Sequence, residues 1–164
     1  MEIVIGIDLG TQGARALAVD LHGNVLAHAE RRLAAQAPTE LPAGWFEQAP
    51  LDWRETVVAT LHDLAANLGE HLHEVRALAA CGTSGTLCLV DAEGTPLRPA
   101  IMYSDMRATA QVGPAAEAWR TLAASVGYTV TSSFALPRLL WVQAHEPHIL
   151  ARARWALSPA DLVA

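Results

Sequence analysis

The sequence predicts an α/β fold built on a mixed sheet whose first three strands are antiparallel neighbours. Apolar runs at 3–7 and 16–19 flank a glycine-bearing turn, and a third strand pattern at 25–33 follows the turn at Gly23-Asn24. Further along the chain, helical and strand patterns alternate, which indicates an α/β layer rather than a helical bundle. A chain of 164 residues is long enough to bury a core as one domain.

The elements after the third strand are predicted from apolar spacing and from turn residues. Residues 34–49 carry prolines and glycine and are expected to form an ordered loop. Apolar residues at helical spacing predict a helix that opens at Pro50 and stops at Gly69. The other expected elements are strands at 75–81 and 86–90, an extended approach to 101–103, helices at 115–125 and 134–145, and a short strand at the end of 151–157.

Composition limits the classes of partner. Hydrophobic residues make up 52% of the chain and charged residues 17%, so we expect much of the surface to be covered by another domain or by a second copy in a homodimer. The net charge of −6 disfavours nucleic acid and anionic membranes as partners. No apolar stretch approaches the roughly 20 residues that cross a bilayer, and no secretory leader pattern is present. We therefore expect a cytoplasmic protein.

The cysteines and histidines predict neither a disulfide nor a zinc site. Cys81 and Cys88 lie in apolar surroundings and are expected to be two buried thiols without a disulfide. The seven histidines lack partners at zinc-ligand spacing and are expected to be solvated.

The first turn contains side chains that suit a phosphate chain and its metal ion. Asp8 lies at the end of a predicted buried strand, and a carboxylate is unfavourable there unless it has a partner. The neighbouring glycines let the backbone approach a ligand closely. Thr11, Gln12 and Arg15 add hydroxyl, amide and guanidinium donors. The alternative is a hairpin turn in which aspartate and glycine serve geometry alone.

Five blocks in a fixed order extend the pattern over essentially the whole chain. They are IDLGTQGAR at 7–15, GWFEQAP at 44–50 with Trp53, GTSGT at 82–86, AIMYSDMRA at 100–108, and PRLLW at 137–141 with Glu146-Pro147 and Asp161 after it. In order and spacing they resemble the N-terminal domain of the FGGY carbohydrate kinases, the family of xylulokinase, ribulokinase and glycerol kinase.

The resemblance implies an actin-like fold of two ribonuclease-H-like domains, with ATP and the sugar bound between them. It implies that Asp8 holds Mg²⁺ through water, since Mg²⁺ keeps much of its hydration. The implied phosphate-binding residues are Gly10, Thr11, Gln12, Gly13 and Arg15, with the guanidinium facing the transferring phosphate.

The sugar side implied by the resemblance consists of Thr83, Ser84, Tyr103 and Asp105. Tyr103 falls where many relatives have tryptophan and could stack on the sugar. Asp105 belongs to an Asp-x-Arg block with Arg107, and a structural ion pair is the alternative interpretation of that block. In the family resemblance, xylulokinases have Gln-Met-His and glycerol kinases have Arg-Glu at the position where this chain has Thr83-Ser84-Gly85. The block looks more like that of the plant and cyanobacterial kinases, so a pentulose is expected, with D-ribulose ahead of D-xylulose.

No catalytic base is expected in this segment. In the family, the aspartate that takes the proton from the sugar hydroxyl lies beyond the region present here, as do the second phosphate loop and the adenosine pocket. Residues 1–164 are thus expected to be an incomplete N-terminal domain that lacks its C-terminal ATP-binding partner and is inactive alone. Two other functions stay open: an actin-like ATPase of chaperone or filament type, and a noncatalytic sugar-binding relative.

Overall fold

The computed structural model describes residues 1–34 and 40–164, so part of the loop expected at 34–49 lies outside the described residues. The chain divides into two compact units. The first unit contains the described residues of 1–35 together with 50–83 and 159–164. The second unit contains the described residues of 36–49 together with 84–158.

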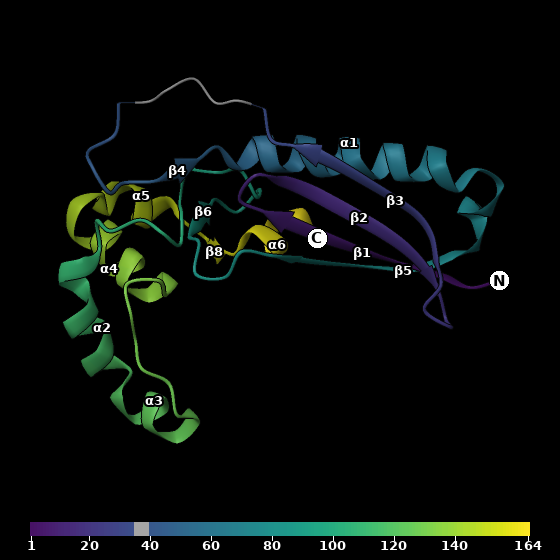
Figure 1. Ribbon diagram of the computed structural model, residues 1–164. Helices are drawn as coiled ribbons and strands as arrows, with labels where there is room; N and C mark the ends of the chain where they lie inside the picture. The colour runs from purple at the N-terminus through teal and green to yellow at the C-terminus, as the bar shows by residue number, and fades with distance from the viewer. Residues whose placement is uncertain (35–39) are drawn as a thin grey trace. The chain divides into compact units, whose positions relative to one another are not determined.

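The first unit is built on a four-stranded mixed sheet. Its strands are β1 (Ile3–Gly10), β2 (Gly13–Asp20), β3 (Val25–Arg32) and β5 (Val75–Gly82), in the order β3-β2-β1-β5 (Figure 1). β2 is antiparallel to both β1 and β3, whereas β5 is parallel to β1, which confirms the predicted mixed sheet. The first hairpin is tighter than predicted, because pairing continues to Gly10 and Gly13 and leaves only Thr11 and Gln12 in the turn.

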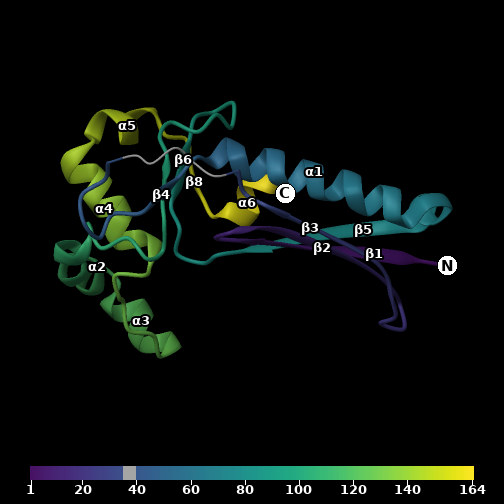
Figure 2. The same ribbon diagram turned by 45° about the horizontal axis from the view of Figure 1, so that its top comes forward.

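Strict alternation gives this sheet one covered face and one open face. Ile3, Ile5, Ile7 and Leu9 of β1 are buried, and the residues between them point the other way. The covered face packs against α1 (Pro50–Leu68), which lies along β2 and β3 (Figure 2) and buries Trp53.

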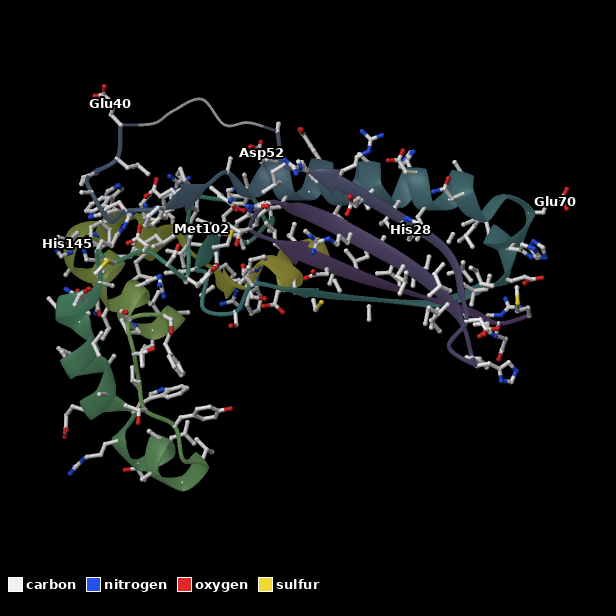
Figure 3. The ribbon with its side chains drawn as sticks, in the orientation of Figure 1. His28, Glu40, Asp52, Glu70, Met102 and His145 are labelled. Carbon is white, nitrogen blue, oxygen red and sulfur yellow. The ribbon has the colours of Figure 1, made fainter. Side chains whose placement is uncertain are left out.

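The ends of α1 lie where the sequence predicts them. Asp52 sits in its first turn, and the 3-10 helix η1 (Gly69–Glu74) follows its last residue (Figure 3). Gly69 has φ +55°, a left-handed value that favours glycine at a helix end. The last helix, α6 (Pro159–Val163), contacts α1 and β5. In the described parts of the chain, no helix has both the length and the apolar character that crossing a membrane requires.

The second unit consists of short strands and helices. β4 (Glu47–Gln48) pairs with β7 (Ala100–Ile101), and β6 (Cys88–Val90) pairs with β8 (Trp155–Leu157), both antiparallel. The helical elements are η2 (Thr109–Gln111), α2 (Val112–Ala118), α3 (Arg120–Val126), α4 (Ala135–His145) and α5 (Pro147–Arg152). The single helix predicted at 115–125 is wrong: it is two helices, because Trp119 between them has ψ 2°, away from the helical value.

The core of the second unit gathers around Trp141 of α4. Leu87, Leu89 and Ile101 are buried with it. The Trp141 ring meets Trp45 edge to face, with 5.3 Å between the ring centres. This packing anchors α4 against the segment that ends at Ile101, two residues before Tyr103.

Candidate functional site

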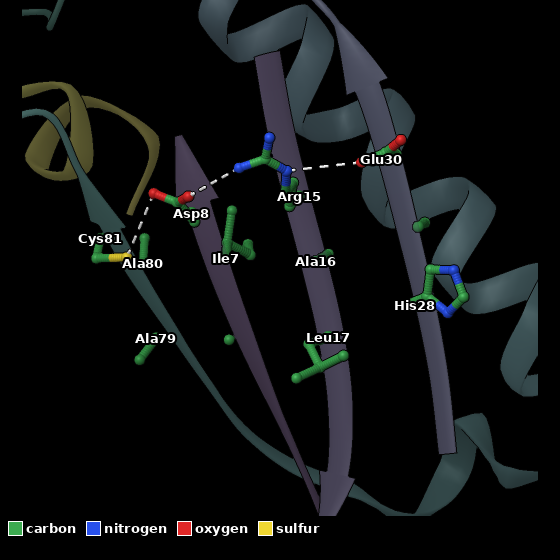
Figure 4. A pocket seen from close by; sticks show the side chains of 12 residues that line it. Ile7, Asp8, Arg15, Ala16, Leu17, His28, Glu30, Ala79, Ala80 and Cys81 are labelled. Atoms are coloured by element: carbon green, nitrogen blue, oxygen red, sulfur yellow. Dashed lines mark hydrogen bonds and ion pairs between the residues drawn. The ribbon is translucent and has the colours of Figure 1, made fainter. Parts of the chain in front are cut away.

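Asp8 and Arg15, two of the predicted metal and phosphate residues, lie side by side on the open face of the first unit's sheet. Asp8 of β1 and Arg15 of β2 are register partners across the hairpin, so their side chains share a face. The Asp8 Oδ2 lies 3.7 Å from Arg15 Nη1, and Arg15 Nε lies 3.6 Å from Glu30 Oε2 on β3 (Figure 4). All three side chains are exposed. The result is a solvent-facing row of carboxylate, guanidinium and carboxylate beside the β1–β2 turn.

A hollow of about 640 Å³ adjoins this charged row on the same face. Most of its other lining is apolar and includes Gly6, Leu17 and Ala79, and His28 of β3 adds an imidazole. Such a floor offers few hydrogen-bond partners. Polar contacts to a ligand in this hollow can come from the charged row, from Cys81 and from His28.

Cys81 joins the charged row and corrects the expectation of two buried thiols. β5 pairs with β1 in a register that sets Cys81 opposite Asp8, so both point to the open face. Its Sγ lies 3.7 Å from Asp8 Oδ1, and Cys81 is exposed. Cys88 is buried as predicted, and burial raises the pKa of its thiol to about 11. The sequence of β5 is apolar almost throughout, so its pattern could not show which side Cys81 faces.

The open face does not hold a preformed metal cage. Among the described residues, no group of three or more His, Cys, Asp or Glu side chains is close enough to hold an ion. Mg²⁺ in phosphoryl-transfer sites typically uses one or two carboxylates together with substrate phosphates and water. On this face Asp8 offers one exposed carboxylate, 3.7 Å from Arg15 Nη1.

The GTSGT block breaks the chain between strands, as predicted. β5 ends at Gly82, Thr83 is the last residue of that stretch of the first unit, and exposed Ser84 opens the second unit. Gly85 has φ +76°, and a Cβ there would lie 1.9 Å from the carbonyl oxygen of Ser133. Only glycine satisfies both conditions.

Tyr103 has an exposed side chain and a backbone that a hydrogen bond holds in place. The side chain belongs to an exposed residue, 42% accessible. Its backbone N–H donates to the Oγ1 of buried Thr86 at 3.2 Å. A fixed backbone with an open ring is an arrangement that could stack on a ligand.

Asp105 lies in the opposite environment, fully buried against Arg107. Its Oδ1 accepts from Arg107 Nε at 2.9 Å and its Oδ2 accepts from Arg107 Nη2 at 2.8 Å. The Oδ2 also accepts from the backbone N–H of Phe46 at 2.6 Å. Of the two interpretations of the Asp-x-Arg block, this geometry favours the structural ion pair.

Arg107 links that pair to its surroundings. Its Nη1 donates to Glu47 Oε1 at 2.7 Å, and its guanidinium carbon lies 3.8 Å from the centre of the Trp45 ring. Arg107 therefore adds to the β4–β7 pairing that joins the GWFEQAP and AIMYSDMRA blocks.

Two further buried arginines were missed at the sequence level. Arg98 lies 2.5 Å from Glu47 Oε1 and 3.3 Å from Glu146 Oε2. Arg138 of α4 is fully buried and donates to backbone carbonyls instead. Burial lowers the pKa of both guanidinium groups. The available signal for Arg138 was a charged residue in the packing stripe of the helix at 134–145.

The mixed sheet β3-β2-β1-β5 and the solved structures that the chain superposes on give it an actin-like ATPase fold. The model for the N-terminal domain of the FGGY family of carbohydrate kinases matches residues 3–164. The chain belongs to this family.

Curated relatives and solved structures agree with that assignment. The chain is 30% identical to a xylulose kinase of Bacillus subtilis over 99% of its length and 34% identical to one of Escherichia coli over 96%. It superposes on a xylulose kinase structure from Rhodospirillum rubrum with a TM-score of 0.84 and 28% identity, over 99% of this chain and 33% of that one. A crystal structure described as a xyloylose kinase from Brucella ovis superposes with a TM-score of 0.87 and 31% identity, over the same shares of the two chains. The chain spans about a third of the length of the curated relatives it matches (32% and 31% of the two named).

Proposed function

We propose that this chain supplies the N-terminal part of an ATP-dependent pentulose kinase. The observation that carries the proposal is the pair of Asp8 and Arg15, which share the open face of the sheet beside the β1–β2 turn. Family membership and the xylulose kinases among its relatives support the same function.

The phosphate side of the proposed site is the first hairpin. Asp8 would hold Mg²⁺ through water, and Arg15 would face the transferring phosphate as a bidentate donor. Gly10, Thr11, Gln12 and Gly13 would supply backbone and side-chain donors to the phosphate chain. Gly13 has a second reason to be glycine, because a Cβ there would lie 2.1 Å from the carbonyl oxygen of Arg31.

The residues proposed to contact the sugar are Thr83 of the first unit and Ser84 and Tyr103 of the second unit. Exposure of Ser84 and Tyr103 supports this assignment. Asp105 is proposed to act indirectly, because its carboxylate already accepts hydrogen bonds from Arg107 and from the Phe46 amide. The proton-accepting base is proposed to lie in residues outside this chain, together with the C-terminal ATP-binding domain.

The sugar is proposed to be a pentulose. The named relatives favour D-xylulose, and the Thr83-Ser84-Gly85 block keeps D-ribulose as the second candidate. Cytoplasmic location and a homodimer remain predictions.

The test uses the full-length protein that contains this chain. Release of ADP is measured with ATP, Mg²⁺ and, in turn, D-xylulose, D-ribulose and glycerol, and again without Mg²⁺. Turnover of one pentulose that depends on Mg²⁺ is expected, with none by the 164-residue chain alone. ADP release that no sugar stimulates would favour the ATPase alternative, and saturable sugar binding without turnover would favour the noncatalytic one.

A further inference from the structure

Several backbone segments of the second unit converge on Arg138. Its Nε donates to the carbonyl of Met102 at 2.9 Å. Its Nη1 donates to the carbonyls of Gly85 at 3.1 Å and Phe134 at 2.7 Å. Its Nη2 donates to the carbonyls of Tyr103 and, at 3.3 Å, of Asp105.

These contacts use the whole guanidinium. Arginine has five N–H donors in a planar fork, and five carbonyl oxygens surround this one. None of the hydrogen bonds goes to a carboxylate, since the nearby Asp105 carboxylate is engaged by Arg107. Arg138 therefore acts on backbone position rather than as half of an ion pair.

The segments it joins are the ones that carry the proposed sugar contacts. Gly85 immediately follows Ser84, and the carbonyls of Met102, Tyr103 and Asp105 belong to the loop that presents the Tyr103 ring. On the other side of this loop, the Tyr103 amide donates to Thr86 Oγ1. Figure 3 labels Met102 at the start of the loop. The 84–86 and 102–105 segments, distant in sequence, are thus tied to one another through α4.

We propose that Arg138 is a positioning residue for the sugar, which it serves by fixing the Tyr103 loop against the Ser84-Gly85 turn. The inference rests on the proposed function, because it takes Tyr103 and Ser84 as sugar contacts. Lysine cannot replace arginine here, since an ammonium has three donors on one point and cannot reach five carbonyls spread around a plane.

The test compares Arg138→Lys with Arg98→Lys in the full-length kinase. Arg98 is the matched control: it is also a buried arginine of the second unit, but its partners are the carboxylates of Glu47 and Glu146. Arg138→Lys is expected to raise the KM for the pentulose by up to about tenfold, the upper range for loss of the Tyr103 contact, because the loop that presents the ring is no longer held. The KM for ATP should stay within about twofold of the wild-type value, a split that general loss of stability would not produce. Arg138→Met, which has no donor, should be worse than lysine.

Amide hydrogen exchange supplies a readout that does not depend on the sugar. The amides of Tyr103 and Asp105 should exchange faster in Arg138→Lys and at the wild-type rate in Arg98→Lys. Wild-type pentulose KM in Arg138→Lys, equal rises in both KM values, or unchanged exchange would each overturn the inference. If Tyr103→Ala also leaves the pentulose KM unchanged while exchange rises, the proposed sugar side is wrong, and the failure lies with the proposed function.

Discussion

Arg107 and Asp105 form a two-point ion pair inside the second unit, with Nε to Oδ1 at 2.9 Å and Nη2 to Oδ2 at 2.8 Å. Both side chains are fully buried. A charge in that position needs its partner, because an isolated buried ion is strongly unfavourable. The pair therefore makes the Asp-x-Arg block a structural requirement of this unit.

Asp105→Asn is predicted to destabilise the protein strongly. Removing one partner of a buried ion pair costs about 3–5 kcal/mol, and the remaining contact of Arg107 with Glu47 should keep the loss near the lower end. Urea unfolding followed by tryptophan fluorescence measures it. Asp63→Asn is the control, because its ion pair with Arg31 is exposed, and it should be close to neutral. A stable Asp105→Asn protein that has lost only sugar binding would instead place Asp105 at the sugar.

Asp8→Asn is predicted to slow the full-length kinase while leaving sugar affinity nearly unchanged. Loss of the charge that would hold Mg²⁺ should cost at least about 2–4 kcal/mol of transition-state stabilisation. Steady-state kinetics at varied Mg²⁺ measures it. Glu30→Gln is the matched control, since Glu30 contacts the other side of Arg15. Loss of sugar binding with an intact rate would show that the two ligands are assigned to the wrong residues.

Tyr103→Ala is predicted to weaken pentulose binding and to leave ATP affinity unchanged, because its exposed ring is the proposed stacking surface. An aromatic contact of this kind contributes about 0.5–1.5 kcal/mol, so the KM for the sugar should rise about twofold to tenfold. Tyr128→Ala serves as control, since Tyr128 is the other tyrosine, is also exposed, and meets Phe134 instead. Equal effects of the two substitutions would contradict the assignment.

Gly85→Ala is predicted to be more destabilising than Gly94→Ala. Both glycines have positive φ, 76° and 79°, so each substitution carries backbone strain of about 1–2 kcal/mol. Only at Gly85 would the new Cβ overlap another atom, the carbonyl oxygen of Ser133, whereas nothing lies within 4 Å at Gly94. Overpacking adds about 1–3 kcal/mol or more. Thermal unfolding of the two variants measures the difference, and equal melting temperatures would refute the close approach.

The two thiols are predicted to differ in reactivity and in their link to pH. At pH 8, a thiol reagent should label exposed Cys81 and leave buried Cys88 unlabelled until the protein unfolds.

The raised pKa of Cys88 means that folding favours its neutral form. Its contribution to stability is full below the ordinary thiol pKa and is lost as the pH rises toward about 11. Unfolding free energies at pH 8 to 10.5 should show this decline, and Cys88→Ala should flatten it.

The sequence by itself determined the first hairpin, the amphipathic helix after it and the family. Apolar runs on both sides of the glycine-bearing turn predict two paired strands, but they do not show that Ile5 and Ile7 point inward and Asp8 outward; the structure does. In β5, likewise, only pairing with β1 decided that Cys81 faces Asp8. A local period can be read from neighbouring residues, whereas register depends on a partner strand far along the chain.

Tertiary structure alone decided the roles of the buried charges. Asp105 and Arg107 are two residues apart, yet their burial depends on Glu47 and Trp45, about sixty positions earlier. Arg138 finds its acceptors in the segments around Gly85, Tyr103 and its own helix. Whether a charged side chain contacts a ligand or the protein depends on which donors and acceptors the fold brings within about 3 Å, and sequence spacing does not encode that distance.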